Sequence, residues 1–368
     1  MKQRNLVFDN LRGICMLGVI AIHVGSMAIS AETATPFAAL ITNILSRYSV
    51  PAFFFISGYG LFYSKPLEEP FSYGQFLKKR LRSIGKPYLI ASLLYLLYYT
   101  IMNRDLSVLD PSNILFSLFF GTAQYHIYFL VILIWFYLLF PLWRSLMRGM
   151  EKVGLKLSLT VLFVLQVLLY EGSFHFWTYP GWIAQSWLLM SLMNFRLNYF
   201  PFFYLFIFML GGVIARHYEG FKALITGKKA LLTAFFAASA GFNTYMFYRW
   251  INLYGMPYEN TINSLQQLSL PGLVYTIASV LFFSMILQSG RYPLKGALKR
   301  MSDRSFVIYL IHPVFIDQLE YVVTKWGGGL SHFPLELFYL LVLGLSWGVA
   351  EIWNLRDRSR VAGRGSRA

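Results

Sequence analysis

Arg12 and His23 are the two residues near the N-terminus whose types and spacing best suit chemistry. They lie eleven positions apart in one apolar stretch, LVFDNLRGICMLGVIAIHVGSM. An α-helix turns about 100° and rises about 1.5 Å per residue, so the spacing predicts one shared helix face and a separation of about 17 Å. Arginine can hold a phosphate and histidine can accept a proton. The alternative is an arginine that reaches to the membrane surface and a histidine hydrogen-bonded between helices.

The composition indicates that the chain carrying this pair is an integral membrane protein. Of the 368 residues, 57% are hydrophobic and 13% are charged, and soluble domains carry about twice that charged fraction. Apolar stretches near the length that crosses a bilayer recur along the whole chain. The sequence therefore predicts an all-α bundle of about ten transmembrane helices. The expected spans are 6–29, 37–63, 84–102, 125–143, 157–171, 199–215, 230–249, 270–288, 305–324 and 333–353.

The basic residues are distributed unevenly between alternate loops. With the N-terminus placed in the cytoplasm, 26 of the 32 Lys and Arg residues fall on the cytoplasmic side. This positive-inside pattern predicts that both chain termini are cytoplasmic. Much of the net charge of +16 is then a topological signal that contacts anionic membrane lipid, so nucleic acid is not an expected partner. Residues 356–368 are expected to form a disordered basic tail.

A second group of candidate residues lies in SRYSVPAFFFISGYGLFYS, residues 46–64. Arg47 falls in the outer half of its span, where a charged group needs a partner. Ser57 lies beside Gly58, and glycine permits either a close backbone approach or a broken helix that lines a cavity. The alternative is a packing helix kinked at Pro51, with an arginine at the membrane interface.

The segment that leads into the third span carries a dense group of cations. Arg80, Arg82 and Lys86 follow two lysines there, on the same predicted side as Arg12. Arg and Lys bind phosphate oxygens through charge-assisted hydrogen bonds, so this segment is a candidate polyphosphate site. The same charges would also be explained by membrane orientation alone.

Three further candidates are two histidines and one tryptophan. His126 is expected at the outer end of the fourth span, and His312 lies inside the ninth, directly before Pro313. Trp182 lies in an aromatic outer segment, residues 172–198, where aromatic faces could stack on sugars or simply mark the membrane interface. Packing roles remain the alternative for both histidines. The chain contains no HExxH, Cys/His metal spacing, P-loop or GxSxG motif, so no metal is expected.

Five segments, in this order, resemble the acyltransferase-3 family of bacterial inner-membrane proteins. They are FDNLRG with the Arg-x10-His spacing of Arg12 and His23, VPAFFFISGY (50–59), KKRLRSIGKPY (78–88), HIYFLVILIWFYLLFP (126–141) and SFVIYLIHP (305–313). The resemblance runs essentially from end to end, and the family's ten spans agree with the count above. Residues 1–355 are therefore expected to form an acyltransferase-3-like transmembrane domain, without the fused extracytoplasmic esterase-like domain of larger members.

The resemblance implies O-acyl transfer across the bacterial inner membrane. The donor would be an acyl-CoA, in the first instance acetyl-CoA, held from the cytoplasm by Arg12, Arg80, Arg82 and Lys86. The acceptor would be a hydroxyl of a surface polysaccharide or glycolipid. His23 would act as general base or as an acyl relay. The oxyanion would be stabilised by His126, Ser57 or backbone N–H groups near Gly58, and the remaining candidates for substrate contact are Arg47, His312 and Trp182.

Two other functions are compatible with the sequence. A transporter or exporter of polysaccharide or lipid-linked sugar would also have about ten spans, but it has no reason to cleave a thioester. A subunit that anchors glycan-synthesis proteins would tolerate substitution of Arg12 and His23. Proteins of glycan synthesis remain potential partners of the acyltransferase as well.

Overall fold

The computed structural model describes residues 5–175, 179–326 and 328–365, with the side chains of His175 and of 355–365 left aside. Every regular element in these residues is a helix. The chain forms two compact parts, each described here by itself. The first part is Met1–Ile56 with His217–Ala368, and the second part is Ser57–Arg216.

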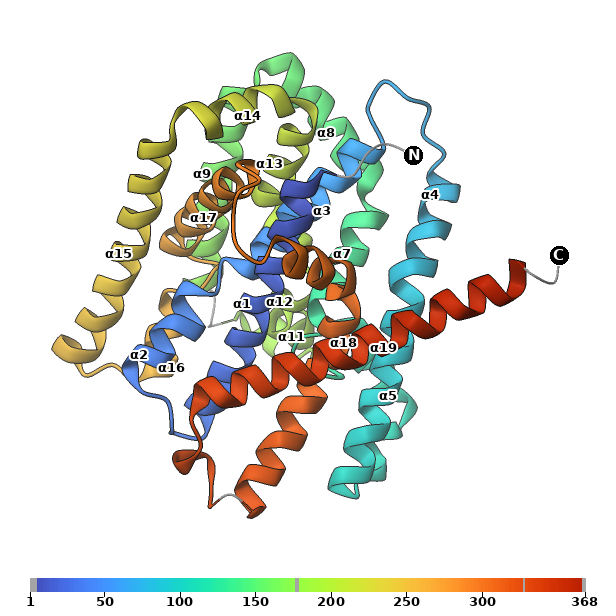
Figure 1. The fold of residues 1–368 in the computed structure, drawn as a ribbon, viewed down its shortest axis with the longest axis vertical. Coiled ribbons are helices and arrows are strands. Elements are labelled where there is room, and N and C mark those ends of the chain that lie inside the picture. The colour runs from blue at the N-terminus through green and yellow to red at the C-terminus, as the bar shows by residue number, and fades with distance from the viewer. Residues whose placement is uncertain (1–4, 176–178, 327, 366–368) are drawn as a thin grey trace. The chain divides into compact units, whose positions relative to one another are not determined.

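The first part contains the N-terminal helices and the helices that follow His217 (Figure 1). Its elements are α1 (Leu6–Ser30), α2 (Pro36–Leu40), the π-helix η1 (Ile41–Leu45), the first half of α3 (Ser49–Ser64), α14 (Tyr218–Gly227), α15 (Lys229–Tyr254), α16 (Tyr258–Ser264), α17 (Leu270–Gln288), α18 (Lys295–Trp326), the 3₁₀ turn η5 (Leu330–His332) and α19 (Leu335–Gly365). Although α19 extends to Gly365, the side chains there are not described, so the disorder expected for 356–368 stays a prediction.

The second part contains the remaining helices. Its elements are the second half of α3, α4 (Tyr73–Arg80), the π-helix η2 (Leu81–Gly85), α5 (Lys86–Asn103), the 3₁₀ turn η3 (Leu106–Leu109), α6 (Pro111–Phe120), α7 (Tyr128–Leu138), α8 (Phe140–Val153), α9 (Leu155–His175), α10 (Gly181–Ala184), α11 (Trp187–Asn194), α12 (Arg196–Tyr199), the 3₁₀ turn η4 (Pro201–Tyr204) and α13 (Leu205–Arg216).

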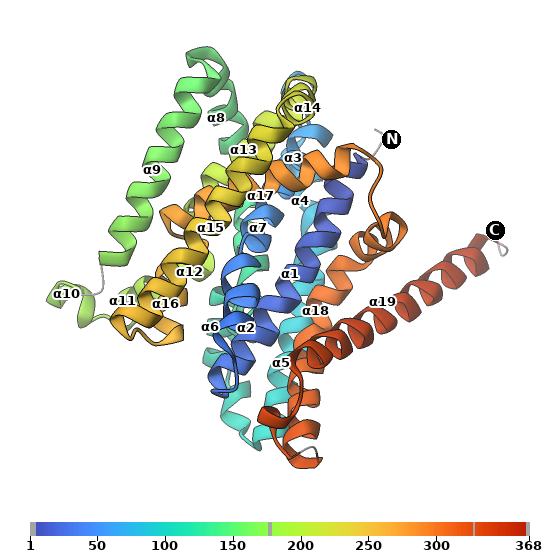
Figure 2. The ribbon, with the colours of Figure 1, turned by 60° about the vertical axis from the view of Figure 1, so that its left-hand side comes forward.

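The first part is organised around α1. The helix begins where the Asn5 side chain accepts the backbone N–H of Val7 at 3.0 Å, which satisfies one of the free donors at a helix start. It packs against α17, α18, α19 and η1, and Figures 1 and 2 both show α1 beside α18. At Gly13 an added Cβ would lie 2.5 Å from the carbonyl oxygen of Leu298 on α18. Glycine is required there because the two backbones meet without an intervening side chain.

The apolar helices agree with a multi-pass membrane protein. Eight described helices are long and apolar enough to span a bilayer, and two interrupted pairs raise the number to as many as ten. The interrupted pairs are Tyr128–Leu138 with Phe140–Val153 and Pro201–Arg216 with Tyr218–Gly227. The first helix of each pair lies in the predicted fourth (125–143) and sixth (199–215) spans, whereas most of the second helix lies outside them.

The predicted fourth span is not one straight helix. It contains all of α7 and only the first residues of α8, and these two helices are bent by 65°. Pro141 lies at the start of α8, and proline lacks the N–H that would continue the hydrogen-bond ladder from α7. The sequence prediction joined α7 to the first residues of α8 because 125–143 is one apolar run, and it placed the basic remainder of α8 in a cytoplasmic segment.

The helix α3 is unbroken from Ser49 to Ser64. Of the two roles predicted for Gly58, the structure shows the close approach, because an added Cβ would meet the backbone carbonyl of Phe208 on α13. The alternative of a broken helix is not observed. Pro51 lies in the first turn of α3, where proline is tolerated, so it does not kink this helix.

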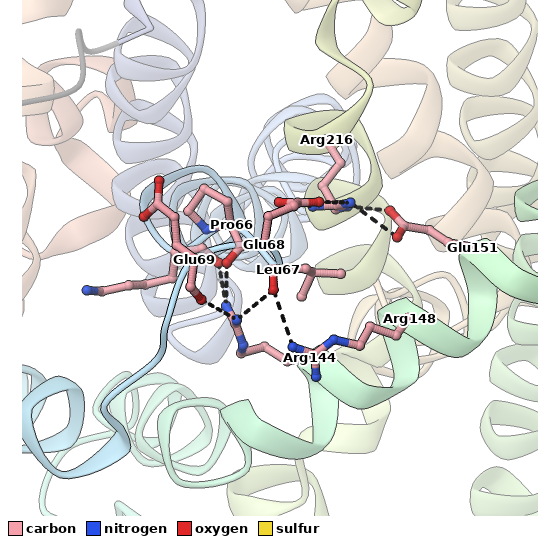
Figure 3. Close-up of polar contacts among 9 residues, drawn as sticks. Pro66, Leu67, Glu68, Glu69, Arg144, Arg148, Glu151 and Arg216 are labelled. Carbon is pink, nitrogen blue, oxygen red and sulfur yellow. Dashed lines mark hydrogen bonds and ion pairs between the residues drawn. The ribbon is translucent and has the colours of Figure 1, made fainter.

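Arg144 of α8 fastens the loop that follows α3, as Figure 3 shows. The side chain is 3% exposed, and its guanidinium carbon lies 4.7 Å from the ring centroid of Phe71. Its N–H groups donate hydrogen bonds of 2.6 to 3.4 Å to the backbone carbonyl oxygens of Lys65, Pro66, Leu67 and Glu69. In this buried guanidinium, the carbonyl oxygens replace water as hydrogen-bond acceptors for the N–H groups. This arginine therefore holds the loop rather than a ligand.

Arg216, at the end of α13, holds two carboxylates near the same loop (Figure 3). It donates to Glu68 at 2.7 and 3.2 Å and pairs with Glu151 of α8. The hydrogen bonds from Arg216 lower the pKa of Glu68 to about 2. The ion pair therefore persists across the physiological pH range.

The Glu68→Gln variant isolates this ion pair. Because the pKa of Glu68 is lowered on folding, the contribution to stability is complete above its ordinary pKa of 4.5 and is lost as the pH falls toward about 2. The difference in melting temperature between wild type and Glu68→Gln in detergent is expected to stay constant from about pH 8 to about pH 5 and to shrink below about pH 4.5. Glu259→Gln, at an exposed position of α16, is the control, and a difference that persists to about pH 2 would contradict the assignment.

Candidate functional site

The ten candidate residues divide between the two parts. The first part contains Arg12, His23, Arg47 and His312, and the second part contains Ser57, Arg80, Arg82, Lys86, His126 and Trp182. The structure brings His23 and His312 of the first set into contact. In the second set, Arg80, Arg82 and Lys86 lie in one segment, whereas Ser57, His126 and Trp182 lie elsewhere in the chain.

His23 and His312 are neighbours. They come from α1 and α18, and their ring centroids lie 5.2 Å apart with an interplanar angle of 35°. His312 is fully buried and His23 is half-buried. Arg12 lies on the same helix as His23, so the rise and rotation expected from their spacing apply to one continuous helix.

Pro313 determines which nitrogen of His312 carries the proton. Proline has no backbone N–H, so the carbonyl of Tyr309, four residues earlier, lacks its usual helical donor. The Nδ1 atom of His312 lies 2.9 Å from that oxygen and 3.2 Å from the carbonyl oxygen of Ile308. A carbonyl oxygen can only accept, so Nδ1 donates and Nε2 holds the lone pair. The sequence shows that His312 directly precedes Pro313, but the effect of this proline on the histidine was not predicted.

The π-helix η1 positions Arg47 in the same part. The backbone N–H of Arg47 bonds the carbonyl of Ile44 at 3.3 Å, so the carbonyl of Asn43 accepts the Arg47 Nε–H at 2.9 Å instead. A second N–H donates to Gln267 at 3.3 Å. Backbone and side-chain oxygens therefore hold this cation in the part of the structure that contains the histidine pair.

Polar contacts also surround the predicted cytoplasmic end of α1. The buried carboxylate of Asp9 lies 3.9 Å from the Lys299 ammonium of α18. The Asn10 amide donates to the Tyr292 hydroxyl at 2.5 Å. These contacts tie α1 to the segment leading into α18, so the end of the helix that carries Arg12 is well positioned.

In the second part, the basic segment offers both fixed and solvent-facing cations. The Arg80 guanidinium lies 5.3 and 5.6 Å from the ring centroids of Tyr137 and Phe76, and these cation–π contacts orient it. Arg82 and Lys86 are exposed. The π-helix η2 begins directly after Arg80, and π-turns are frequent at functional sites. Exposed cations on an ordered backbone suit a phosphate-bearing ligand.

His126 is buried in the turn before α7. It is 2% exposed, and its ring makes edge contacts with Tyr95 and Tyr125 at 5.7 and 5.8 Å. Trp182 on the short α10 is 68% exposed. That exposure fits either of the roles considered for it.

The oxyanion donors expected near Gly58 need a correction. Because α3 is unbroken, the backbone N–H groups in its interior donate to the preceding turn. They are not free to stabilise a developing charge. Ser57 is half-buried on this helix, so a donor from this segment would have to be its hydroxyl.

Sequence reasoning missed three groups that hold candidate residues of the first part in place. Asn43 and Gln267 hold Arg47, and the Tyr309 carbonyl holds His312. The His-Pro pair in an apolar run was a usable signal, since proline always frees the carbonyl four residues before it. No local signal marks Gln267, because it is 220 residues away from Arg47.

Comparisons with known proteins give a family and one distant relative. The family profile described as an acyltransferase domain, acyltransferase-3, matches residues 5–351. An amino-acid racemase of Enterococcus faecalis is 26% identical over 373 aligned positions, which cover 98% of this chain and 48% of that protein. The chain therefore spans about half the length of this curated relative. No solved structure matches the chain.

Proposed function

We infer an O-acyl transfer reaction on the premise that the chain belongs to the acyltransferase-3 family. Membership of this family supports the activity of a membrane acyltransferase. The proposed donor is acetyl-CoA, bound from the cytoplasmic side of the bacterial inner membrane. The proposed acceptor is a hydroxyl of a surface polysaccharide or glycolipid.

The observation that carries this proposal is the contact between His23 and His312. With Nδ1 of His312 donating to a backbone carbonyl, its Nε2 can accept an N–H from His23 after a small rotation of either ring. The other nitrogen of His23 is then the base. This is the logic of a catalytic base oriented by a third group.

The proposed reaction needs one proton acceptor and one stabilising charge. His23 takes the proton from the acceptor hydroxyl as its oxygen attacks the thioester carbonyl. The carbon–sulfur bond then breaks, and His23 returns the proton to the leaving thiolate of CoA. Arg47, which is held by the Asn43 carbonyl in the same part, is the proposed source of positive charge for the oxyanion that forms in between.

The phosphates of the proposed acyl-CoA donor would bind cations that lie at a different membrane depth from His23. Arg12 lies about three helical turns before His23, a distance of about 17 Å. The arm of CoA separates its phosphates from its thioester, so one side chain can hold a phosphate while the other meets the acyl group. Arg82 and Lys86 are further candidates for the phosphates because they are exposed.

The double variant Arg82→Gln/Lys86→Gln is expected to raise the KM for acetyl-CoA by about tenfold at low salt, because exposed charge-assisted bonds are screened by solvent. The rate at saturating donor should not change, because neither residue meets the acyl group. Initial rates over a range of donor concentrations measure both constants. Lys228→Gln/Lys229→Gln, on another exposed segment, removes the same charge and is the control. An equal rise in both double variants would refute a specific donor contact.

Transfer of radiolabel from acetyl-CoA tests the proposed function directly. Inverted membrane vesicles should incorporate label into envelope glycan as an alkali-labile ester, and Arg12→Ala should abolish this incorporation. Arg249→Ala is the matched control, since that arginine bonds only tyrosine hydroxyls in the contacts described for it. Glycan movement without ester formation would instead favour a transporter. The racemase activity in the relative's name is not carried over, because the match covers 48% of that protein.

A further inference from the structure

We propose that a pocket of the second part binds a neutral sugar ring of the acceptor; this rests on the acyl transfer proposed above. The pocket lies among α5, η3, α6 and the turn before α7 and has a volume of about 360 Å³. Sites for small ligands measure about 300–1,000 Å³. Its lining includes Tyr99, Asn113, Phe116, Ser117, Thr122 and Tyr125.

The chemistry of the lining matches a sugar. Hydroxyl and amide groups come from Asn113, Ser117 and Thr122, and each can both donate and accept hydrogen bonds. Aromatic rings from Tyr99 and Phe116 offer flat apolar surface to the C–H faces of a pyranose. Polar groups placed beside aromatic side chains are typical of sites that fix the orientation of a small ligand.

The polar lining is already ordered by hydrogen bonds. The Gln124 amide donates to the Tyr99 hydroxyl at 2.5 Å, and the Asn113 amide donates to a backbone carbonyl of η3 at 2.8 Å. Thr122 donates to Ser117 at 3.4 Å. Because these side chains are already held, little binding free energy is lost to ordering them when a ligand binds.

Gly121 brings this pocket next to His126. It ends α6 in the left-handed conformation, with φ of 65°, and an added Cβ would lie 2.6 Å from the Cα of Tyr128. The turn can thus run directly onto α7. Tyr125 lines the pocket, and its ring contacts the His126 ring at 5.8 Å. The positive-inside pattern predicts that this loop region is extracytoplasmic, the side of a surface glycan.

The charges favour a neutral sugar over an acidic one. No charged side chain is among the residues that line this described pocket. Next to it, the Asp105 carboxylate accepts the backbone N–H of Ser107, which itself lines the pocket, at 2.9 Å. A sugar carboxylate would meet this negative charge without a cation in the lining to offset it.

Filling the pocket provides the first test. Release of CoA from acetyl-CoA is followed in wild type, Ser117→Trp, Asn113→Ala and Ser112→Trp, with and without the methyl glycosides of glucose, galactose and mannose. Ser112 lies exposed on the same helix but outside the lining, so its variant is the matched control. At least one neutral glycoside is expected to accelerate release by wild type and Ser112→Trp. Its KM should rise about tenfold or more in Ser117→Trp, a loss worth about 1.4 kcal/mol.

The outcomes separate this inference from the proposed function. Absence of donor-only CoA release in wild type would count against the acyltransferase itself. Intact donor-only release with no acceleration by any neutral glycoside, or stronger acceleration by methyl glucuronide, would overturn the pocket proposal. Equal KM values in Ser117→Trp and Ser112→Trp would overturn it as well.

Cysteine protection provides a test that needs no catalysis. The single cysteine, Cys15, is buried in α1, so Cys15→Ala gives a background without thiols. Ser117→Cys in this background should react with a membrane-impermeant maleimide in intact cells, and the neutral methyl glycosides should slow that reaction. Ser112→Cys should react at an unchanged rate. Labelling of Ser117→Cys that is insensitive to all three glycosides would contradict the proposal.

Discussion

Replacing His23 with alanine is expected to lower kcat for acyl transfer by about 10²- to 10⁴-fold, the usual contribution of a general base. The KM for acetyl-CoA should change little, because the phosphates are held elsewhere. Initial rates of radiolabel transfer by the purified protein measure both constants. His332→Ala is the control, since that exposed ring bonds only local groups in the contacts described for it.

A loss of activity in His23→Ala has to be separated from a loss of fold. His23→Gln keeps a polar side chain of similar size at the same half-buried position but cannot accept a proton at neutral pH. It should retain the melting temperature of wild type and lose as much activity as His23→Ala. Full activity in His23→Gln would show that the residue only packs or donates a hydrogen bond.

Replacing His312 is expected to lower kcat by about 10- to 100-fold, because it orients the base rather than accepting the substrate proton. His312→Asn is the informative variant. Its amide can still donate to the Tyr309 carbonyl, so the helix keeps its hydrogen bond, but the nitrogen corresponding to Nε2 is gone. We expect kcat to fall with an unchanged KM for the donor and a melting temperature close to that of wild type.

Pro313→Ala tests the same arrangement from the backbone. Alanine restores an N–H that competes with Nδ1 of His312 for the Tyr309 carbonyl. The proton on Nδ1 is then no longer fixed, and kcat should fall several-fold although no ring has been removed. Equal rates in wild type, Pro313→Ala and His312→Asn would mean that His312 has only a packing role.

The fold was predictable where one signal dominates. Long apolar runs identify α1, α17 and α18 because a bilayer demands continuous helices of this length. The same signal did not predict the bend between α7 and α8, because Pro141 lies within the apolar run 125–143 that was predicted as one span. The π-helix η1 was equally hidden, because local composition does not distinguish it from an α-helix.

The site was predictable to the extent that it lies on single helices. Arg12 and His23 share α1, so their spacing alone placed them on one face. The meeting of His23 with His312 depends on how α1 packs against α18, which the glycine at position 13 permits. Spacing along the chain cannot predict such a contact.

The central claim is that His23 serves as the base of a thioester-cleaving site, and free CoA tests it most directly. The purified protein is incubated with acetyl-CoA in detergent without acceptor, and released CoA is followed with a thiol reagent. Water can replace the sugar hydroxyl, so wild type should release CoA slowly, and His23→Ala should reduce the rate to background while His332→Ala retains it. Equal release by wild type and His23→Ala, or no release by wild type together with no acetyl-CoA binding by calorimetry, would contradict the account.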